Sequence, residues 1–148
     1  MKIKNYTSKV PVGLTVSRIE QMLAEAGASG VMKDYTAGSL TALSFRIATP
    51  TGKAFTVRLP ANRQAVYDVM LKEWKTPTEA TKRRLLDQSE RTAWKLIQDW
   101  VAVQLSLIVM QQADVLQVFM PYIWDGEATF YERVRSNGYK QLPMSTGS

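Results

Sequence analysis

The apolar segment 87–112 restricts the fold of this 148-residue chain more than any other stretch. Asp87 and Glu90 have the spacing of a capping box, which predicts that a helix begins at Asp87. Beyond this start, apolar side chains recur at helical spacing on two faces. One face carries Trp94, Ile97, Val101, Leu105 and Ile108, and the other carries Leu96, Trp100, Val103, Leu107 and Met110. Because a helix with two apolar faces needs cover on both sides, the segment predicts a buried central helix, covered within one chain or partly by a second copy.

Three segments before this helix have the pattern of an antiparallel sheet. The sequence predicts strands over residues 31–36, 40–49 and 53–59, joined by turns that contain Gly or Pro. The second and third strands alternate apolar and polar side chains, so one sheet face is apolar and the other is polar. Residues 2–7 alternate as well and predict a short strand, which adds a fourth strand if it pairs alongside the others.

The sequence also predicts helices on both sides of the sheet segments. Thr15 caps the first, which ends near Ala26 because Gly27 stops it. Asn62 caps the second, which ends near Trp74. The remaining predicted elements are a short helix at 85–86 and longer helices over 114–122 and 127–136.

Strands followed by helices indicate a single α+β domain over residues 1–143. Its small antiparallel sheet is expected to pack on a helical bundle around the central helix, and residues 144–148 are expected to form a disordered tail. The N-terminus lacks the apolar core of a signal peptide, and the longest apolar run falls short of the roughly 20 residues that cross a membrane. We therefore expect a soluble, cytoplasmic protein that does not bind membranes.

Two missing residue types restrict the chemistry. The chain has no cysteine and no histidine, which excludes disulfides, thiolate metal sites and the commonest general base. We therefore expect no enzymatic activity, no cofactor and no bound metal. One alternative is a carboxylate–metal site: Glu73 and Lys75, with Asp68 upstream, match part of a nuclease signature, although they fall on a predicted helix instead of a strand. Asp125 and Glu127 are a second acidic pair, but Asp-Gly is more simply a turn.

The formal charge of +6 favours an anionic partner, with nucleic acid first. On the polar sheet face, cations alternating with tyrosines would neutralise phosphates and stack unpaired bases. The expected contact residues on this face are Lys4, Tyr6, Lys33, Tyr35, Arg46 and Arg58. A basic connection adds Lys82, Arg83 and Arg84, whose contacts with phosphates would weaken with salt. These residues predict non-enzymatic binding of nucleic acid, preferably single strands; ordinary solvated positions are the alternative for both groups.

Four short stretches together resemble a group of small uncharacterised proteins from bacteriophages and integrated mobile elements. They are Lys4-Asn5-Tyr6-Thr7, Met32-Lys33-Asp34-Tyr35, Leu59-Pro60-Ala61-Asn62, and the stretch from Arg91-Thr92-Ala93-Trp94 to Asp99-Trp100-Val101. The group has no assigned activity, so the resemblance transfers no functional residue. It implies an accessory role in a bacterial host, where small proteins of this kind handle nucleic acid or block a host factor.

A protein-interaction module is the second function that the sequence leaves open. Aromatic residues gather late in the chain, and most are expected in the core. Trp124, beside a predicted turn, is a candidate for an exposed anchor to a partner protein. Such a module would inhibit a host defence or replication factor. Its contacts would depend less on salt than contacts with phosphates.

Overall fold

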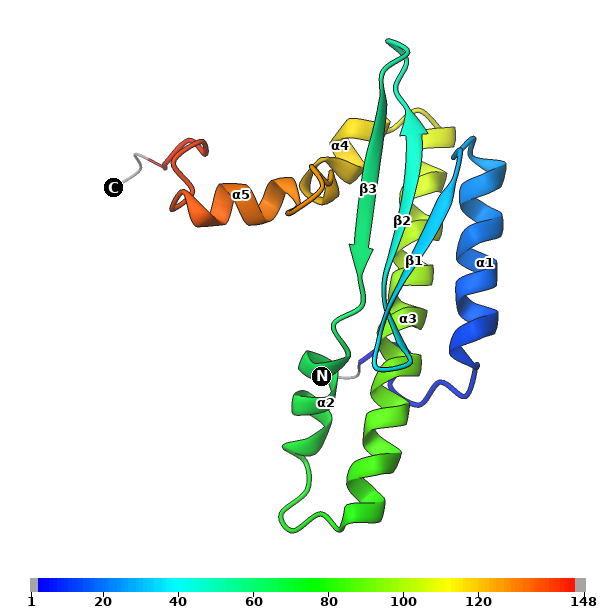
Figure 1. Ribbon diagram of the computed structural model, residues 1–148, viewed down its shortest axis with the longest axis vertical. Helices are drawn as coiled ribbons and strands as arrows, with labels where there is room; N and C mark the ends of the chain where they lie inside the picture. The colour runs from blue at the N-terminus through cyan, green and yellow to red at the C-terminus, as the bar shows by residue number, and fades with distance from the viewer. Residues whose placement is uncertain (1–2, 146–148) are drawn as a thin grey trace.

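Helix α3 (Glu79–Val109) is the longest element of the computed structural model, which describes residues 3–145. It runs along the long axis of the molecule (Figure 1). The predicted start at Asp87 is wrong, because the helix begins after Thr78, whose side chain accepts a hydrogen bond from the backbone N–H of Thr81. The residues before Asp87 include Glu, Ala, Lys, Arg and Leu, all strong helix formers, so nothing interrupts the helix there. The predicted short helix at 85–86 is therefore part of α3.

Three antiparallel strands, β1 (Val31–Thr36), β2 (Ser39–Ala48) and β3 (Ala54–Pro60), form a sheet in that order. This confirms the predicted meander and the α+β fold. A two-residue turn joins β1 to β2, and both of its residues, Ala37 and Gly38, have positive φ angles of 51° and 80°. Turns of this kind match the twist of the strands that they connect, which fixes the hairpin register.

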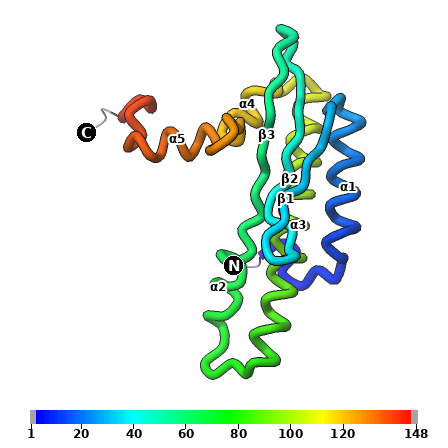
Figure 2. The backbone as a smooth tube through the Cα atoms, viewed as in Figure 1, coloured from blue at the N-terminus to red at the C-terminus, as the bar shows by residue number. Residues whose placement is uncertain are grey.

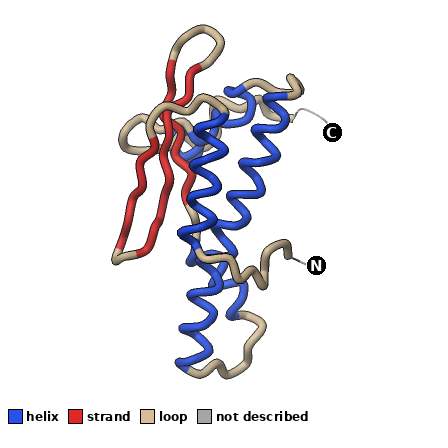
Figure 3. Tube along the Cα trace, turned by 90° about the vertical axis from the view of Figure 1, so that its right-hand side faces the viewer, coloured by secondary structure: helices blue, strands red, loops and turns tan. Residues whose placement is uncertain are grey.

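The sheet covers one side of α3 and of helix α1 (Val12–Glu25), so the body of the molecule has two layers (Figure 3). The two layers enclose the core, whose side chains include Ile19, Leu23, Leu43, Phe45, Val57, Leu59, Trp94 and Val101. Trp94 is fully buried, and its indole N–H donates to the carbonyl of Leu40 (3.2 Å). Since burying a large apolar side chain contributes about 1.5–3 kcal/mol, Trp94 fixes the middle of α3 to β2.

The two shorter helices of the body differ from the predictions at one end each. In α1, Pro11 occupies the N-cap position, and Thr15, the expected cap, is instead buried in the first turn. Proline fits there because its φ is already close to the helical value. Helix α2 (Arg63–Leu71) has the expected cap, Asn62, but ends early and leaves Trp74 in the connection to α3.

After α3 the chain forms an arm whose last helix extends away from the body (Figures 1 and 2). The arm consists of α4 (Val115–Phe119), the 3-10 helix η1 (Met120–Tyr122) and α5 (Phe130–Ser136). The first two together occupy the helical stretch predicted over 114–122. The backbone N–H of Trp124 donates to the carbonyl of Thr56 (2.8 Å), which attaches the arm to the free edge of β3.

The N-terminal segment contradicts the predicted fourth strand. Residues 4–7 form a turn, and Asn5 has a φ of 63°, which is incompatible with an extended strand. The carbonyl of Asn5 accepts a hydrogen bond from the hydroxyl of Thr92 on α3 (2.8 Å) instead of from a neighbouring strand. Lys2, the first residue of the predicted strand, lies outside the described residues.

The two apolar faces of α3 are covered to different extents. Val101 and Leu105 are buried, whereas Val103 and Met110 on the second face are 56% and 69% exposed. Within residues 3–145, no helix is apolar over a sufficient length to cross a membrane. Of the predicted tail, residues 144 and 145 have no regular secondary structure, and 146–148 lie outside the described part of the chain.

Candidate nucleic-acid interface

The polar face of the sheet carries Arg46 and Arg58, as predicted. Arg46 pairs with Thr56 across β2 and β3, and Arg58 lies two residues further along β3 and so on the same face. Arg58 forms an ion pair with Asp34 of β1, and its guanidinium lies 4.6 Å from the ring centre of Trp124. These contacts join the sheet to the arm, so the charge of Arg58 is already engaged within the fold.

The predicted position of Lys33 and Tyr35 on that outer face is wrong. Lys33 pairs with Leu43 and Tyr35 with Leu40, two buried residues, and the register shifts within β1. Since cross-strand partners share a face, both side chains lie on the helix side at the edge of the sheet. The ammonium of Lys33 is 2.6 Å from the carboxylate of Glu20 on α1, and this hydrogen bond raises the pKa of Lys33. Lys33 therefore joins β1 to α1.

The predicted sheet-face residues do not form one surface. Lys4, in the N-terminal segment, packs against α3, and its ammonium is 3.3 Å from the carboxylate of Asp99 on that helix. Burial opposes the ionisation of Asp99, but hydrogen bonds from Asn5 and Lys4 lower its pKa overall. Arg46 is exposed on the outer face, with no ion pair to any acidic side chain that the structure describes. One isolated cation on the sheet is a weak basis for binding a phosphate backbone.

The predicted basic connection, Lys82-Arg83-Arg84, is part of α3 and not a mobile segment. Neighbouring residues of a helix point about 100° apart, so the three side chains diverge around the axis. Lys82 pairs with Glu79 (3.4 Å), and the guanidinium of Arg84 lies 5.5 Å from the ring centre of Trp74. Lys82 and Arg84 therefore already have partners within the fold, and Arg83 is exposed.

Residues 4–10 lie across α3 as an irregular segment, here called the N-terminal strap (Figure 3). Side chains of α3 hydrogen-bond its backbone. The carbonyl of Ser8 accepts from Gln88 Nε2 (2.9 Å) and from Arg91 Nε (3.3 Å). Thr92 binds the carbonyl of Asn5 in the same way. The strap thereby brings residues 6–9 next to residues 84–91, although they are far apart in the sequence.

A cavity of about 420 Å³ lies between the strap, the end of α2 and the first half of α3. Its size is within the range of about 300–1,000 Å³ that is usual for small-molecule sites. The aromatic and charged residues that line it are Tyr6, Lys9, Glu73, Trp74, Arg84 and Arg91. We call this site the basic-aromatic cavity.

Positive charge predominates in the basic-aromatic cavity, where Lys9, Arg84 and Arg91 face a single acidic residue, Glu73. Arg91 is held in place, because its Nη2 donates to Gln88 Oε1 (2.7 Å) while its Nε binds the strap. Burial and a hydrogen bond to Glu73 raise the pKa of Tyr6, so this hydroxyl remains protonated at neutral pH. Cations beside aromatic rings are suited to a phosphate attached to a planar base.

Tyr6 and Arg84 are the two predicted contact residues that the fold brings together in this cavity. Neither Lys9 nor Arg91 is among the predicted contact residues. The missing signal has a physical reason: Lys9 and Arg91 meet only because Ser8 is hydrogen-bonded to α3. Local periodicity carries no information on such a contact.

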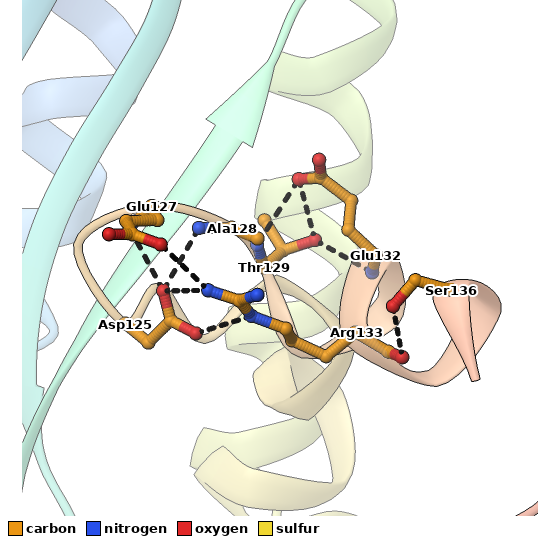
Figure 4. Close-up of polar contacts among 7 residues, drawn as sticks. All are labelled: Asp125, Glu127, Ala128, Thr129, Glu132, Arg133 and Ser136. Carbon is orange, nitrogen blue, oxygen red and sulfur yellow. Dashed lines mark hydrogen bonds and ion pairs between the residues drawn. The ribbon is translucent and has the colours of Figure 1, made fainter.

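The two acidic alternatives have structural explanations. Glu73 follows α2 and faces cations in the cavity, and Asp68 lies within α2. Asp125 accepts hydrogen bonds from two backbone N–H groups of its turn, and Arg133 binds both Asp125 (2.8 Å) and Glu127 (3.3 Å) (Figure 4). The cation that Asp125 and Glu127 share is thus the guanidinium of Arg133. Among residues 3–145, no group of three or more acidic side chains is placed to hold a metal ion.

The last helix, α5, begins later than predicted because Thr129 is its N-cap. Thr129 and Glu132 form a capping box (Figure 4). The side-chain oxygen of Thr129 accepts from the N–H of Glu132, and the Glu132 carboxylate accepts from the N–H of Thr129. The backbone N–H groups of Thr129 and Glu132, which have no partner within the helix, are thereby both hydrogen-bonded.

Comparisons with protein-family models, with curated proteins and with solved structures found no match to this chain.

Proposed function

We propose that this protein binds single-stranded nucleic acid without catalysis and that the basic-aromatic cavity is its principal contact site. The observation that carries the proposal is the convergence of Lys9, Arg84 and Arg91 on one cavity beside Trp74 and Tyr6. The cations neutralise phosphates. Trp74 is 43% exposed, so its ring offers a face on which a base stacks. A cavity admits a base only when that base is unpaired, which favours single strands over duplexes.

The placement of the cations supports a role in binding over a role in stability. Arg84 is exposed on α3, and its aromatic partner, Trp74, lies in the connection between α2 and α3 instead of in the core. Lys9 is exposed on the strap. These side chains contribute little to the core, so an external anion is the partner that their arrangement fits best.

Two matched double variants test the proposal by fluorescence anisotropy with a labelled 15-nucleotide single strand. Lys9→Ala with Arg84→Ala removes two charges from the cavity. Arg46→Ala with Lys53→Ala removes one charge from the outer sheet face and one from the exposed turn between β2 and β3. If each cavity cation contacts one phosphate, the first variant has a salt slope of log K that is shallower by about 1.4. The second changes affinity less than about twofold, because charges beyond a Debye length of about 8–10 Å are screened. Equal losses in both variants would refute a localised site.

A second candidate function rests on the uncovered face of α3. Val109 and Met110 are each more than half exposed and line a groove between α1 and the end of α3. Exposed apolar side chains that gather in one place are typical of protein contacts. This face fits the alternative of a protein-interaction module, in which a host factor or a second copy covers α3. Binding there is expected to be nearly independent of salt, which separates it from binding of phosphates.

The biological setting implied by the sequence resemblance, an accessory protein of a bacteriophage or mobile element, is part of the proposal. A small protein that coats or captures exposed single strands fits that setting. Binding measured with both DNA and RNA strands of one sequence would establish which nucleic acid it prefers, because the 2′-hydroxyl distinguishes the two.

A further inference from the structure

Glu73 is the feature of the basic-aromatic cavity that phosphate binding does not explain. Its carboxylate lines the same cavity as Lys9, Arg84 and Arg91. A negative charge there weakens the binding of any ligand that is anionic throughout. The ligand that suits the whole cavity therefore has a negative part for the three cations and a hydrogen-bond donor for the carboxylate.

The Glu73 carboxylate keeps acceptor capacity for such a donor. An ionised carboxylate has about four acceptor positions, and the Tyr6 hydroxyl bonds to Glu73 from the strap side. Glu73 and Trp74 both line the cavity, so a ring stacked on the indole shares that space with the carboxylate. The guanidinium of Arg84 lies over one face of the indole, 5.5 Å from its centre, which leaves the opposite face for a base.

Among the standard bases, guanine matches a carboxylate best. Its ring N1–H and its exocyclic amino group are adjacent donors, which the two oxygens of one carboxylate accept together. Adenine and cytosine place a ring-nitrogen acceptor beside their amino group, and this lone pair would face a carboxylate oxygen. Thymine and uracil flank their only ring N–H with two carbonyl acceptors. The mismatched bases are thus opposed by repulsion as well as by a lost hydrogen bond.

We propose that the basic-aromatic cavity holds one unstacked guanine nucleotide of a bound single strand, with Glu73 accepting from the guanine N1–H and amino group. Trp74 stacks on the base, and Lys9, Arg84 and Arg91 bind its phosphates. This inference rests on the proposed function and adds base selectivity to it. A bidentate pair of this kind discriminates between bases by roughly 5- to 150-fold in affinity.

The test uses 15-nucleotide oligothymidylates in which the central base is guanine, adenine, cytosine or hypoxanthine, with affinities measured by anisotropy. The full-length protein is expected to bind the guanine strand at least about 5-fold more tightly than the adenine and cytosine strands. Hypoxanthine lacks the exocyclic amino group and is expected to lose most of this advantage. Equal affinity for all four strands would overturn the inference.

The variant Glu73→Gln tests the assigned residue, and Glu79→Gln, at an exposed carboxylate of α3 outside the cavity, is its matched control. Both changes are at exposed positions and are expected to leave the fold intact, which circular dichroism checks. E73Q is expected to lose the guanine preference while its affinity for unmodified oligothymidylate rises, because the repulsive charge is removed from the cavity. Retention of the preference by E73Q would also overturn the inference.

The same data distinguish two failures. Salt-dependent binding of every strand with no preference for guanine would refute the guanine pocket but not the proposed binding of single strands. Absence of binding to all strands at low salt would refute both.

Discussion

Replacing Thr92 by Val tests how the strap builds the cavity. Thr92 is fully buried, and its hydroxyl donates to the carbonyl of Asn5 (2.8 Å) and accepts from Gln88 Nε2 (3.1 Å). Valine has nearly the same shape, so the substitution removes hydrogen bonds without creating a cavity. Gln88 keeps its bond to Ser8, and the carbonyl of Asn5 keeps the backbone N–H of Ser8 (3.1 Å) but loses the partner that α3 provides. A typical hydrogen bond within a protein contributes about 0.5–1.5 kcal/mol to stability.

The expected result is a decrease of about 1 kcal/mol in the free energy of unfolding, or roughly 2–4 °C in Tm for a chain of this size. Urea unfolding followed by tryptophan fluorescence measures it. Because the strap carries Tyr6 and Lys9, a loosened strap also lowers the affinity for a single strand. Thr36→Val, the same chemical change at an exposed position of β1, is the control and is expected to change stability by less than about 0.5 kcal/mol. Unchanged stability and unchanged affinity in T92V would refute the structural role given to the strap.

Three further predictions concern the scaffold. Trp94→Phe removes buried volume and the hydrogen bond to Leu40 and is expected to cost about 2–4 kcal/mol in urea unfolding; a loss below about 1 kcal/mol would contradict its central position. Gly38→Ala places a side chain at a φ of 80° and is expected to destabilise the hairpin by about 1–2 kcal/mol, so an unchanged Tm would count against this turn geometry. Hydrogen bonds from Arg133 and from the turn lower the pKa of Asp125. The ionised carboxylate therefore stabilises the arm fully at any pH above its ordinary pKa of about 3.9, and this stabilisation is lost as the pH falls through the lower pKa of the folded state. NMR signals of α5 that stay constant from pH 5 to the acid limit would contradict this last prediction.

The sheet was predictable from the sequence because its pattern is local. Alternating side chains in β2 and β3, together with turn residues between the strands, are sufficient to indicate strands and their inner face. The phase of β1 was not predictable, since it depends on a register shift that places Tyr35 opposite Leu40. One shifted residue moved Lys33 from the expected ligand-binding face to an ion pair with Glu20.

The candidate site was less predictable than the fold. The start of α3 was misplaced because the Asp87–Glu90 spacing also occurs inside helices. There the backbone N–H groups are already bonded within the helix, so the two side chains cap nothing. The cavity depends on hydrogen bonds between Ser8 and α3, which no local pattern reports. Net positive charge draws attention to the cations of the chain, but only tertiary packing determines which of them converge.

The most direct test of the central claim is the affinity of the unmodified protein for a single strand and for the corresponding duplex, each measured over a series of salt concentrations. The proposed site predicts that the single strand binds more tightly at physiological salt. It also predicts a log–log salt slope near −2, because three cations of the cavity contact phosphates at about −0.7 each. Equal affinity for the two forms, or a slope near zero, would contradict single-strand binding through the basic-aromatic cavity.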